Sequence, residues 1–165
     1  MRRTASVTLF VALLLSLVVL SATASAERTA VPAPAIVKVA FNKKLKESIL
    51  VDGRGLTVYV FALDARAGRA RFCYDDALYH CSKIWPPLRT KGAPRAGPGA
   101  KRSLLGVVKH PDGGVQVTYN GHPLYMNAGS RDNGLIRDKK PGDVNGQGFA
   151  GLWSVVSPKG APIRD

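Results

Sequence analysis

The sequence predicts a mainly β fold, with two tandem hairpin-plus-loop repeats packed as one small pseudo-two-fold domain. Short runs of β-branched and aromatic residues alternate with turns rich in Gly, Pro, Asn and Asp. Few segments carry the 3.6-residue apolar period that is typical of an amphipathic helix. Similar hairpin patterns also recur at matching distances along the chain, which indicates an internal repeat.

The segment from Met1 to Ala26 has the layout of a secretory signal peptide. Arg2 and Arg3 make the start of the chain positive, and residues 7–20 contain no charge. Small residues follow and end in an A-x-A cleavage site at residues 24–26. The uncharged run is shorter than the ~20 apolar residues that a membrane-spanning helix needs. We therefore expect cleavage after Ala26, with an uncleaved N-terminal anchor as the alternative.

The part of the chain that remains after cleavage has the length of one domain. Residues 27–35 are rich in Pro and Ala and are expected to form a flexible leader. Residues 36–165 are expected to form a single β-rich domain around one core. The two cysteines, Cys73 and Cys81, lie far from the cleavage point, so no lipid anchor is expected. The sequence predicts a secreted or periplasmic protein that does not span the membrane after cleavage.

The first repeat is expected over residues 36–102. Residues 36–41 have the composition of a strand, and residues 48–52 and 56–62 flank a Gly-rich turn, which predicts a hairpin. A polar loop follows over residues 63–84. Residues 89–102 are rich in Gly, Pro and Arg and are expected to form an exposed loop.

The second repeat is expected over residues 103–165. Residues 115–119 alternate between apolar and polar side chains, as a half-buried strand does. Asn120-Gly121 is a strong hairpin signal, and residues 123–127 are the expected partner strand. A polar loop over residues 128–150 precedes a last strand over residues 151–157.

The spacing of four aromatic residues supports the repeat. The distance along the chain from Tyr59 to Trp85 nearly equals the distance from Tyr125 to Trp153. The separation of the two tyrosines therefore nearly equals that of the two tryptophans. We expect the aromatic residues of both repeats to pack into one core, because a domain of this size needs their large apolar area. An exposed aromatic platform for a ligand is the alternative.

Cys73 and Cys81 are expected to form a disulfide, because exported proteins meet an oxidising compartment. The closed loop of nine residues would stabilise the fold by about 2.5 kcal/mol in the chain-entropy account. A metal site or reactive thiol pair is the alternative, although the spacing is neither C-x-x-C nor C-x-x-C-H.

The chain is strongly basic, with 24 Lys and Arg against 11 Asp and Glu. Loss of Arg2 and Arg3 with the signal peptide leaves 22 against 11, a net charge of +11. A field of this sign attracts anionic polymers and surfaces, such as those of a cell envelope, although it also simply favours solubility. No helix-turn-helix, zinc-finger or RNP-like motif accompanies the charge, and export argues against a nucleic-acid partner. The oligomeric state is left open.

No catalytic residues are predicted. The chain lacks a G-x-S-x-G nucleophile motif, and His80, His110 and His122 fall in expected loops or turns. Scattered histidines of this kind are typical of ordinary surface positions, so we expect no enzyme.

No metal ligands and no cofactor are predicted either. Asp132, Asp138 and Asp143 lie in one Gly-rich loop and could supply oxygen ligands to Ca²⁺. Asp and Asn are also the usual residues of turns, and we favour that interpretation. A copper site at His110, His122 and Met126 is a weaker alternative.

Residues 59–64, Y-V-F-A-L-D, resemble the Y-x-(F/W/Y)-x-x-D motif of a family of bacterial secreted proteins and lipoproteins, the secreted repeat of unknown function. Residues 42–59 are similar to the family's strand entry, and residues 81–88 to its C-x-x-x-W-P-P-L segment. Residues 119–125 are similar to its second hairpin, and residues 141–160 to its closing segment. The resemblance covers residues 37–163. The family-motif positions that it marks are Tyr59, Phe61, Asp64, Trp85, Tyr125, Asp143 and Trp153.

The sequence departs from the family pattern at two places. Many relatives carry a lipobox Cys at the cleavage site, where this chain has Ala, and Asn127 stands in the second repeat where Phe61 stands in the first. For Asp64 two roles are open: it caps the following turn, or it orients a ligand beside a tyrosine hydroxyl.

The resemblance implies no activity, so the function is expected from the residues alone. We expect a non-catalytic envelope or extracellular module, with a binding or structural role and a basic surface. The alternatives are a metal-binding or redox-accessory protein and, further away, an enzyme.

Overall fold

The structure is a computed structural model that describes residues 34–64, 73, 80–110 and 113–164. The expected signal peptide lies outside these residues, as does almost all of the expected leader. Residues 31–165 form one compact unit. Within the described residues, no helix is long and apolar enough to cross a membrane.

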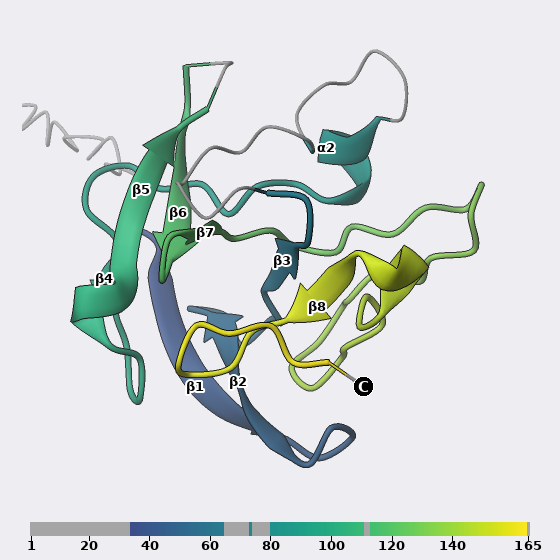
Figure 1. Cartoon of the computed structure of the whole chain (residues 1–165), viewed down its shortest axis with the longest axis horizontal. Coiled ribbons are helices and arrows are strands. Elements are labelled where there is room, and N and C mark those ends of the chain that lie inside the picture. Colours follow the sequence, from purple (N-terminus) through teal and green to yellow (C-terminus); the bar gives the residue numbers. More distant parts are fainter. Residues whose placement is uncertain (1–33, 65–72, 74–79, 111–112, 165) are drawn as a thin grey trace, which may run out of the picture. The chain divides into compact units, whose positions relative to one another are not determined.

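Strands dominate the described residues, which confirms the expectation of a mainly β protein (Figure 1). Helical turns are short and few among them. In chain order the elements are β1 (Ile36–Asn42), β2 (Glu47–Asp52), β3 (Tyr59–Phe61), α2 (Cys81–Ile84), β4 (Arg95–Ala96), η1 (Arg102–Leu104), β5 (Leu105–Lys109), β6 (Val115–Tyr119), β7 (His122–Pro123), η2 (Phe149–Gly151) and β8 (Trp153–Val155).

The first sheet has the strand order β2-β1-β4. Strands β1 and β2 pair antiparallel from Val37 opposite Asp52 to Asn42 opposite Glu47, so they form a hairpin. Strand β4 adds to the other edge of β1 in parallel over two residues. The expected strand over residues 36–41 is therefore present, and its hairpin partner is β2.

The hairpin expected between residues 48–52 and 56–62 is not formed as predicted. The two segments share a single bridge, Val51 to Thr57, beside a turn in which the Asp52 carboxylate accepts the N–H of Leu56. Beyond that bridge the chain leaves β2, and β3 pairs antiparallel with β8. The sequence could not show this partner, because strand pairing between such distant segments depends on how the aromatic side chains pack.

The hairpin expected at Asn120-Gly121 is present. Both residues have positive φ, 51° and 79°, as a two-residue hairpin turn of this kind requires. Strand β6 pairs with β7 on one side and with β5 on the other. The partner strand is shorter than residues 123–127, because the backbone of Tyr125 pairs with that of Tyr59 instead.

The buried side chains form two clusters. The larger one contains most of the buried aromatic residues that the structure describes and also takes in Cys73. The other gathers aliphatic side chains and Tyr119 from the strands. The members of the larger cluster are Ile49, Val51, Tyr59, Phe61, Cys73, Trp85, Tyr125, Leu135, Val144, Trp153 and Val155.

Cys73 and Cys81 are joined by a disulfide, as the sequence predicts. Cys73 is fully buried, and Cys81 begins α2. The bridge therefore ties the start of α2, and with it the segment that leads to Trp85, to the aromatic cluster.

Candidate functional site

The two motif tyrosines belong to the aromatic cluster, and their backbones pair with each other. The N–H of Tyr59 donates to the carbonyl of Tyr125, and the N–H of Tyr125 donates to the carbonyl of Tyr59, both at 2.9 Å. This reciprocal pair joins the start of β3 to the residues that follow β7. Both side chains are buried, at 0% and 1% exposure.

Each tyrosine hydroxyl donates to a buried aspartate that is distant in sequence. Tyr59 Oη donates to Asp138 Oδ2 at 2.5 Å, and Tyr125 Oη donates to Asp64 Oδ2 at 2.8 Å. The Asp64 carboxylate lies beside the hydroxyl of Tyr125, whereas the turn that it was expected to cap lies outside the described residues. The two hydrogen bonds cross between residues 36–102 and residues 103–165.

The two motif tryptophans stack on each other next to this pair. Their ring centroids are 3.9 Å apart and their planes differ by 6°. Tyr59 packs edge-on against Trp85 at 5.3 Å, and Tyr125 packs edge-on against Trp153 at 5.2 Å. Phe61 stacks on the Trp153 ring at 4.6 Å. These aromatic residues are buried, so they form a core and not an exposed platform.

Burial raises the pKa of the Tyr59 hydroxyl well above its ordinary value, and the charge of Asp138 adds to this effect. Burial also raises the pKa of Asp138, although the hydrogen bonds from Tyr59 and from the N–H of Asn145 oppose the shift. Gly146 N–H donates to Tyr59 Oη at 3.2 Å. The polar atoms of this buried pair are thus supplied with partners from the chain itself, which favours a structural role.

Asp143 has a different environment at the surface. Its Oδ2 accepts the backbone N–H groups of Lys139 and Lys140 at 3.0 and 3.2 Å, and these bonds lower its pKa. This is the turn chemistry that the sequence favours over a calcium site. Among the residues that the structure describes, no three His, Cys, Asp or Glu side chains come together as metal ligands.

The three histidines lie on separate elements. His80 is exposed before α2, His110 is buried at the end of β5, and His122 is half-buried in β7. The Nδ1 of His110 lies 3.1 Å from a guanidinium nitrogen of Arg89.

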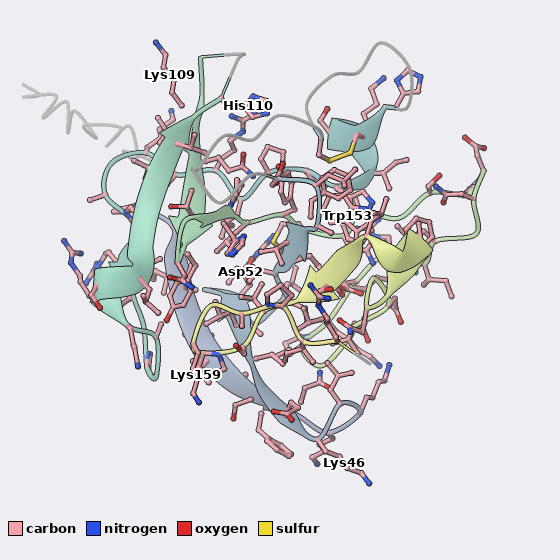
Figure 2. The ribbon with its side chains drawn as sticks, viewed as in Figure 1. Lys46, Asp52, Lys109, His110, Trp153 and Lys159 are labelled. Atoms are coloured by element: carbon pink, nitrogen blue, oxygen red, sulfur yellow. A yellow bond between two sulfur atoms is a disulfide. The ribbon has the colours of Figure 1, made fainter. Side chains whose placement is uncertain are left out.

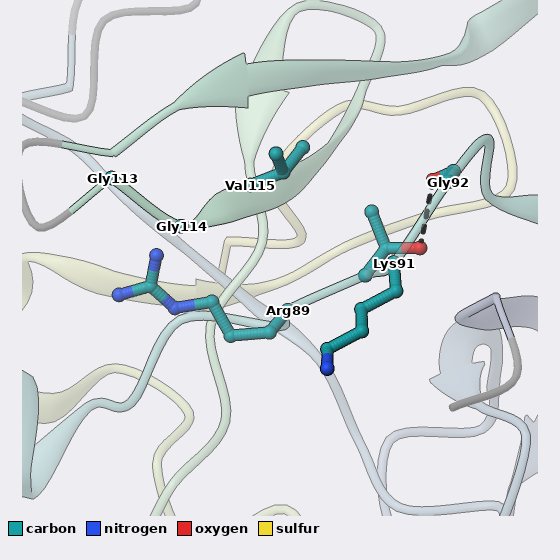
Figure 3. Close-up of a pocket in the computed structure, with 7 residues that line it drawn as sticks. Arg89, Lys91, Gly92, Gly113, Gly114 and Val115 are labelled. Carbon is teal, nitrogen blue, oxygen red and sulfur yellow. Dashed lines mark hydrogen bonds between the residues drawn. The ribbon is translucent and has the colours of Figure 1, made fainter. Parts of the chain in front are cut away.

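Several depressions lie on the described surface. The Arg89 groove, of about 570 Å³, runs between residues 89–92 and residues 113–115, with Arg89 and Lys91 as its cations (Figure 3). Another pocket, also of about 570 Å³, is lined by the motif residues Phe61 and Trp153, with Arg164 among its other residues. Because Phe61 and Trp153 are only 8% and 4% exposed, this pocket offers little aromatic surface to a ligand.

The most basic of these depressions, of about 650 Å³, lies along the β1–β2 hairpin and is called here the hairpin groove. Its apolar residues include Ile49 and Val51 of β2. Of the described residues that line it, only Asp143 is acidic. Its five cationic residues are Lys38, Lys43, Lys44, Arg54 and Lys140.

The loop with Asp143 is fixed against the hairpin by two long-range hydrogen bonds. Asn42 Nδ2 donates to the carbonyl of Gly142 at 3.1 Å, and Thr57 Oγ1 donates to the carbonyl of Asp143 at 2.6 Å. Segments from opposite ends of the domain sequence therefore build one basic groove. Sequence reasoning found Asp143 as a motif position but missed the groove, because its cations do not form a continuous run.

Fold and site together define a small β-rich domain with a disulfide-linked loop, a buried core of motif residues and a basic groove. Residues 106–157 match the model of a family described as a secreted repeat of unknown function, and over that segment the chain is similar to this family. The match runs from β5 to just past β8 and includes Tyr125, Asp143 and Trp153. A secreted family agrees with the expectation of an exported protein. No curated protein and no solved structure gives a significant match.

Proposed function

We propose that the chain is an exported, non-catalytic module that binds anionic groups of the cell envelope in the hairpin groove. The observation that carries this proposal is the convergence of five cationic residues on one groove with a single acidic neighbour. Like charges gathered from distant parts of a chain repel one another, so a partner of opposite charge stabilises such a site.

The lone acid in the groove offsets only one of the five positive charges, although its carboxylate acts electrostatically on Lys44 and Lys140. Asp143 holds the N–H groups of Lys139 and Lys140, which fixes the loop that carries the ammonium group of Lys140. Within the described residues, no hydrogen bond or salt bridge engages the ammonium groups of Lys43, Lys44 and Lys140. These three lysines are the groups that we expect to contact the ligand.

The other two cations are partly engaged. Arg54 forms a salt bridge with Asp52 at 2.8 Å, and Lys38 Nζ donates to the carbonyl of Gly53 at 3.0 Å. They contribute to the positive field and line the groove walls. Ammonium groups at several points along a groove suit phosphate or carboxylate groups that repeat along a polymer or a surface.

The proposal is tested by titrating the exported chain with inorganic polyphosphate as a soluble polyanion. The variant Lys43→Gln/Lys44→Gln/Lys140→Gln should weaken binding by at least about tenfold, since each lost contact removes a charge-assisted interaction. The control Lys101→Gln/Lys109→Gln/Lys159→Gln removes the same charge from exposed residues outside the groove, two of which appear in Figure 2. Equal weakening by both variants would show that only net charge matters and would refute the groove as the site.

We also propose that the two halves of the domain are repeats related by an approximate two-fold relationship. The supporting observations are the reciprocal backbone pair of Tyr59 and Tyr125 and the two crossed hydrogen bonds to Asp138 and Asp64. The stacked tryptophans, each with its own tyrosine edge-on, point the same way. In this arrangement the motif residues hold the two halves together, and the ligand binds at surface residues of the hairpin groove.

A further inference from the structure

The end of the β1–β2 hairpin exposes a large aromatic side chain. Phe41 is 65% exposed, whereas the other phenylalanine of the strands, Phe61, is 8% exposed. Side chains alternate along a strand, so Phe41 shares a face of β1 with Val37 and Val39. Val37 is fully buried and Val39 is half-buried. The apolar face of β1 thus continues past the region that the rest of the domain covers.

The turn next to Phe41 carries three exposed lysines, Lys43, Lys44 and Lys46. Lys46 adopts a left-handed conformation with φ of 54°, which Gly or Asn adopts more readily than Lys. The side chain of Lys46 points away from the domain at the end of the hairpin (Figure 2). The backbone conformation at this position is unfavourable for a lysine. Its presence there suggests that the positive charge has a function.

Hydrogen bonds of the Asn42 side chain support the end of the hairpin. Asn42 Oδ1 accepts the N–H groups of Lys44 and Leu45, both at 3.0 Å, and its amide donates to the loop at Gly142. Leu45 packs against the aromatic cluster and so anchors the turn to the core. A fixed turn presents its lysines and Phe41 to a partner with little loss of conformational entropy.

We propose that the end of the β1–β2 hairpin docks on an anionic lipid surface, with Phe41 entering the headgroup region and the three lysines facing the lipid charges. Exposed Phe side chains can enter the boundary between headgroups and acyl chains, and clustered lysines are attracted to anionic headgroups. This inference rests on the proposed function, because it names the envelope component that the hairpin contacts. A second copy of the chain is a poor occupant, since two such ends would bring six lysines together.

The experiment is co-sedimentation of the exported chain with vesicles of two compositions. One set is an equimolar mixture of phosphatidylglycerol and phosphatidylcholine, and the other is phosphatidylcholine alone. We expect binding to the anionic vesicles only. Phe41→Ala should lower that binding by about tenfold, the loss that corresponds to withdrawing most of a phenyl ring from an apolar medium. It should weaken polyphosphate binding much less than vesicle binding, because Phe41 lines the hairpin groove but carries no charge.

Ile136 provides a matched control for the assignment of the surface. It is 66% exposed, lies near Arg131, Arg137 and Lys139 in sequence, and belongs to a different loop. Ile136→Ala should leave vesicle binding unchanged, and an equal loss in both variants would overturn the hairpin end as the docking surface. Binding of polyphosphate without binding of anionic vesicles would overturn the lipid inference alone. Binding of neither would overturn the proposed function as well.

Discussion

Tyr59 and Tyr125 form an antiparallel backbone pair, and each donates its hydroxyl to an aspartate from the opposite half of the domain. The pair brings together segments that are far apart in the sequence. Because both carboxylates are buried, each hydroxyl satisfies a group that is costly to leave without a donor. We therefore expect Tyr59, Tyr125, Asp64 and Asp138 to stabilise the fold.

Replacing either tyrosine by phenylalanine should destabilise the domain while leaving the aromatic ring in place. Tyr59→Phe and Tyr125→Phe each remove the hydroxyl donor to a buried carboxylate, at a cost of about 1–3 kcal/mol in unfolding free energy. Urea denaturation measures this loss. Tyr119→Phe is the control. Tyr119 Oη accepts the N–H of Lys101 and donates to the carbonyl of Pro158, so its partners are backbone groups and not a carboxylate. A loss for Tyr119→Phe as large as for the other two would contradict the assigned role of the carboxylates.

Asp138 should make the domain less stable as the pH rises. Its pKa is raised in the folded chain above the ordinary value of 3.8, so the folded state binds this proton more tightly than the unfolded state. The contribution of Asp138 to stability is therefore largest below pH 3.8 and decreases as the pH rises through the raised pKa. Asp138→Asn removes the titrating group. As the pH rises through the raised pKa, the unfolding free energy of the wild type relative to this variant should fall. The fall should be about 1.4 kcal/mol for each unit by which the pKa is raised.

Asp143→Asn is the internal control for this pH dependence, because its sign is opposite. The pKa of Asp143 is lowered by backbone hydrogen bonds, so its contribution is present above its unfolded pKa and is lost as the pH falls through the folded value. Unfolding free energies measured between about pH 3 and pH 7 separate the two residues. A wild-type advantage over Asp138→Asn that does not change with pH would exclude the raised pKa.

Gly146 should not tolerate a side chain. A Cβ atom there would lie 2.6 Å from Cη2 of Trp85 and 2.9 Å from Cε1 of Tyr59. Both rings are buried and held by other aromatic residues, so Gly146→Ala should cost about 1–3 kcal/mol through overpacking. Gly53→Ala is a milder comparison, with its closest contact 3.3 Å from the side chain of Ile36. Thermal melting that ranks the two variants in the reverse order would show that the aromatic cluster adjusts more easily than its packing indicates.

The disulfide should contribute a measurable part of the stability. Cys73→Ser/Cys81→Ser should lower the unfolding free energy by about 2.5 kcal/mol, since the nine-residue loop is then unconstrained in the unfolded chain. Reduction of the wild type should give a similar loss, as measured by urea denaturation with and without a reductant. If the thiols titrate as fully reduced and the denaturation midpoint does not move, the bridge does not support the aromatic cluster.

Local patterns in the sequence predicted what depends on neighbouring residues. The hairpin turn at Asn120-Gly121, the strand over residues 36–41 and the pairing of Cys73 with Cys81 all follow from short-range chemistry. The partner of β3 could not be predicted in this way. A Gly-rich turn after β2 favours a local hairpin, but β3 pairs with β8 instead, and the rings of Phe61 and Trp153 stack across that pair.

The same limit applies to the candidate site. The sequence marked Asp64 as a motif acid but gave no sign that its partner is Tyr125, or that Tyr59 pairs with Asp138. The hairpin groove combines Lys43 and Lys44 with Lys140, which are neighbours only in the folded chain. Its one local signal was the charged turn after β1, which is visible in the sequence but has no distinctive spacing.

The salt dependence of polyphosphate binding tests the central claim most directly. The affinity of the exported chain should fall steeply as salt concentration rises, because groove lysines that contact a polyanion release its bound cations. A plot of the logarithm of affinity against the logarithm of salt concentration should be clearly flatter for Lys43→Gln/Lys44→Gln/Lys140→Gln than for the wild type. Equal slopes, with the charge-matched control as reference, would contradict anion binding in the hairpin groove.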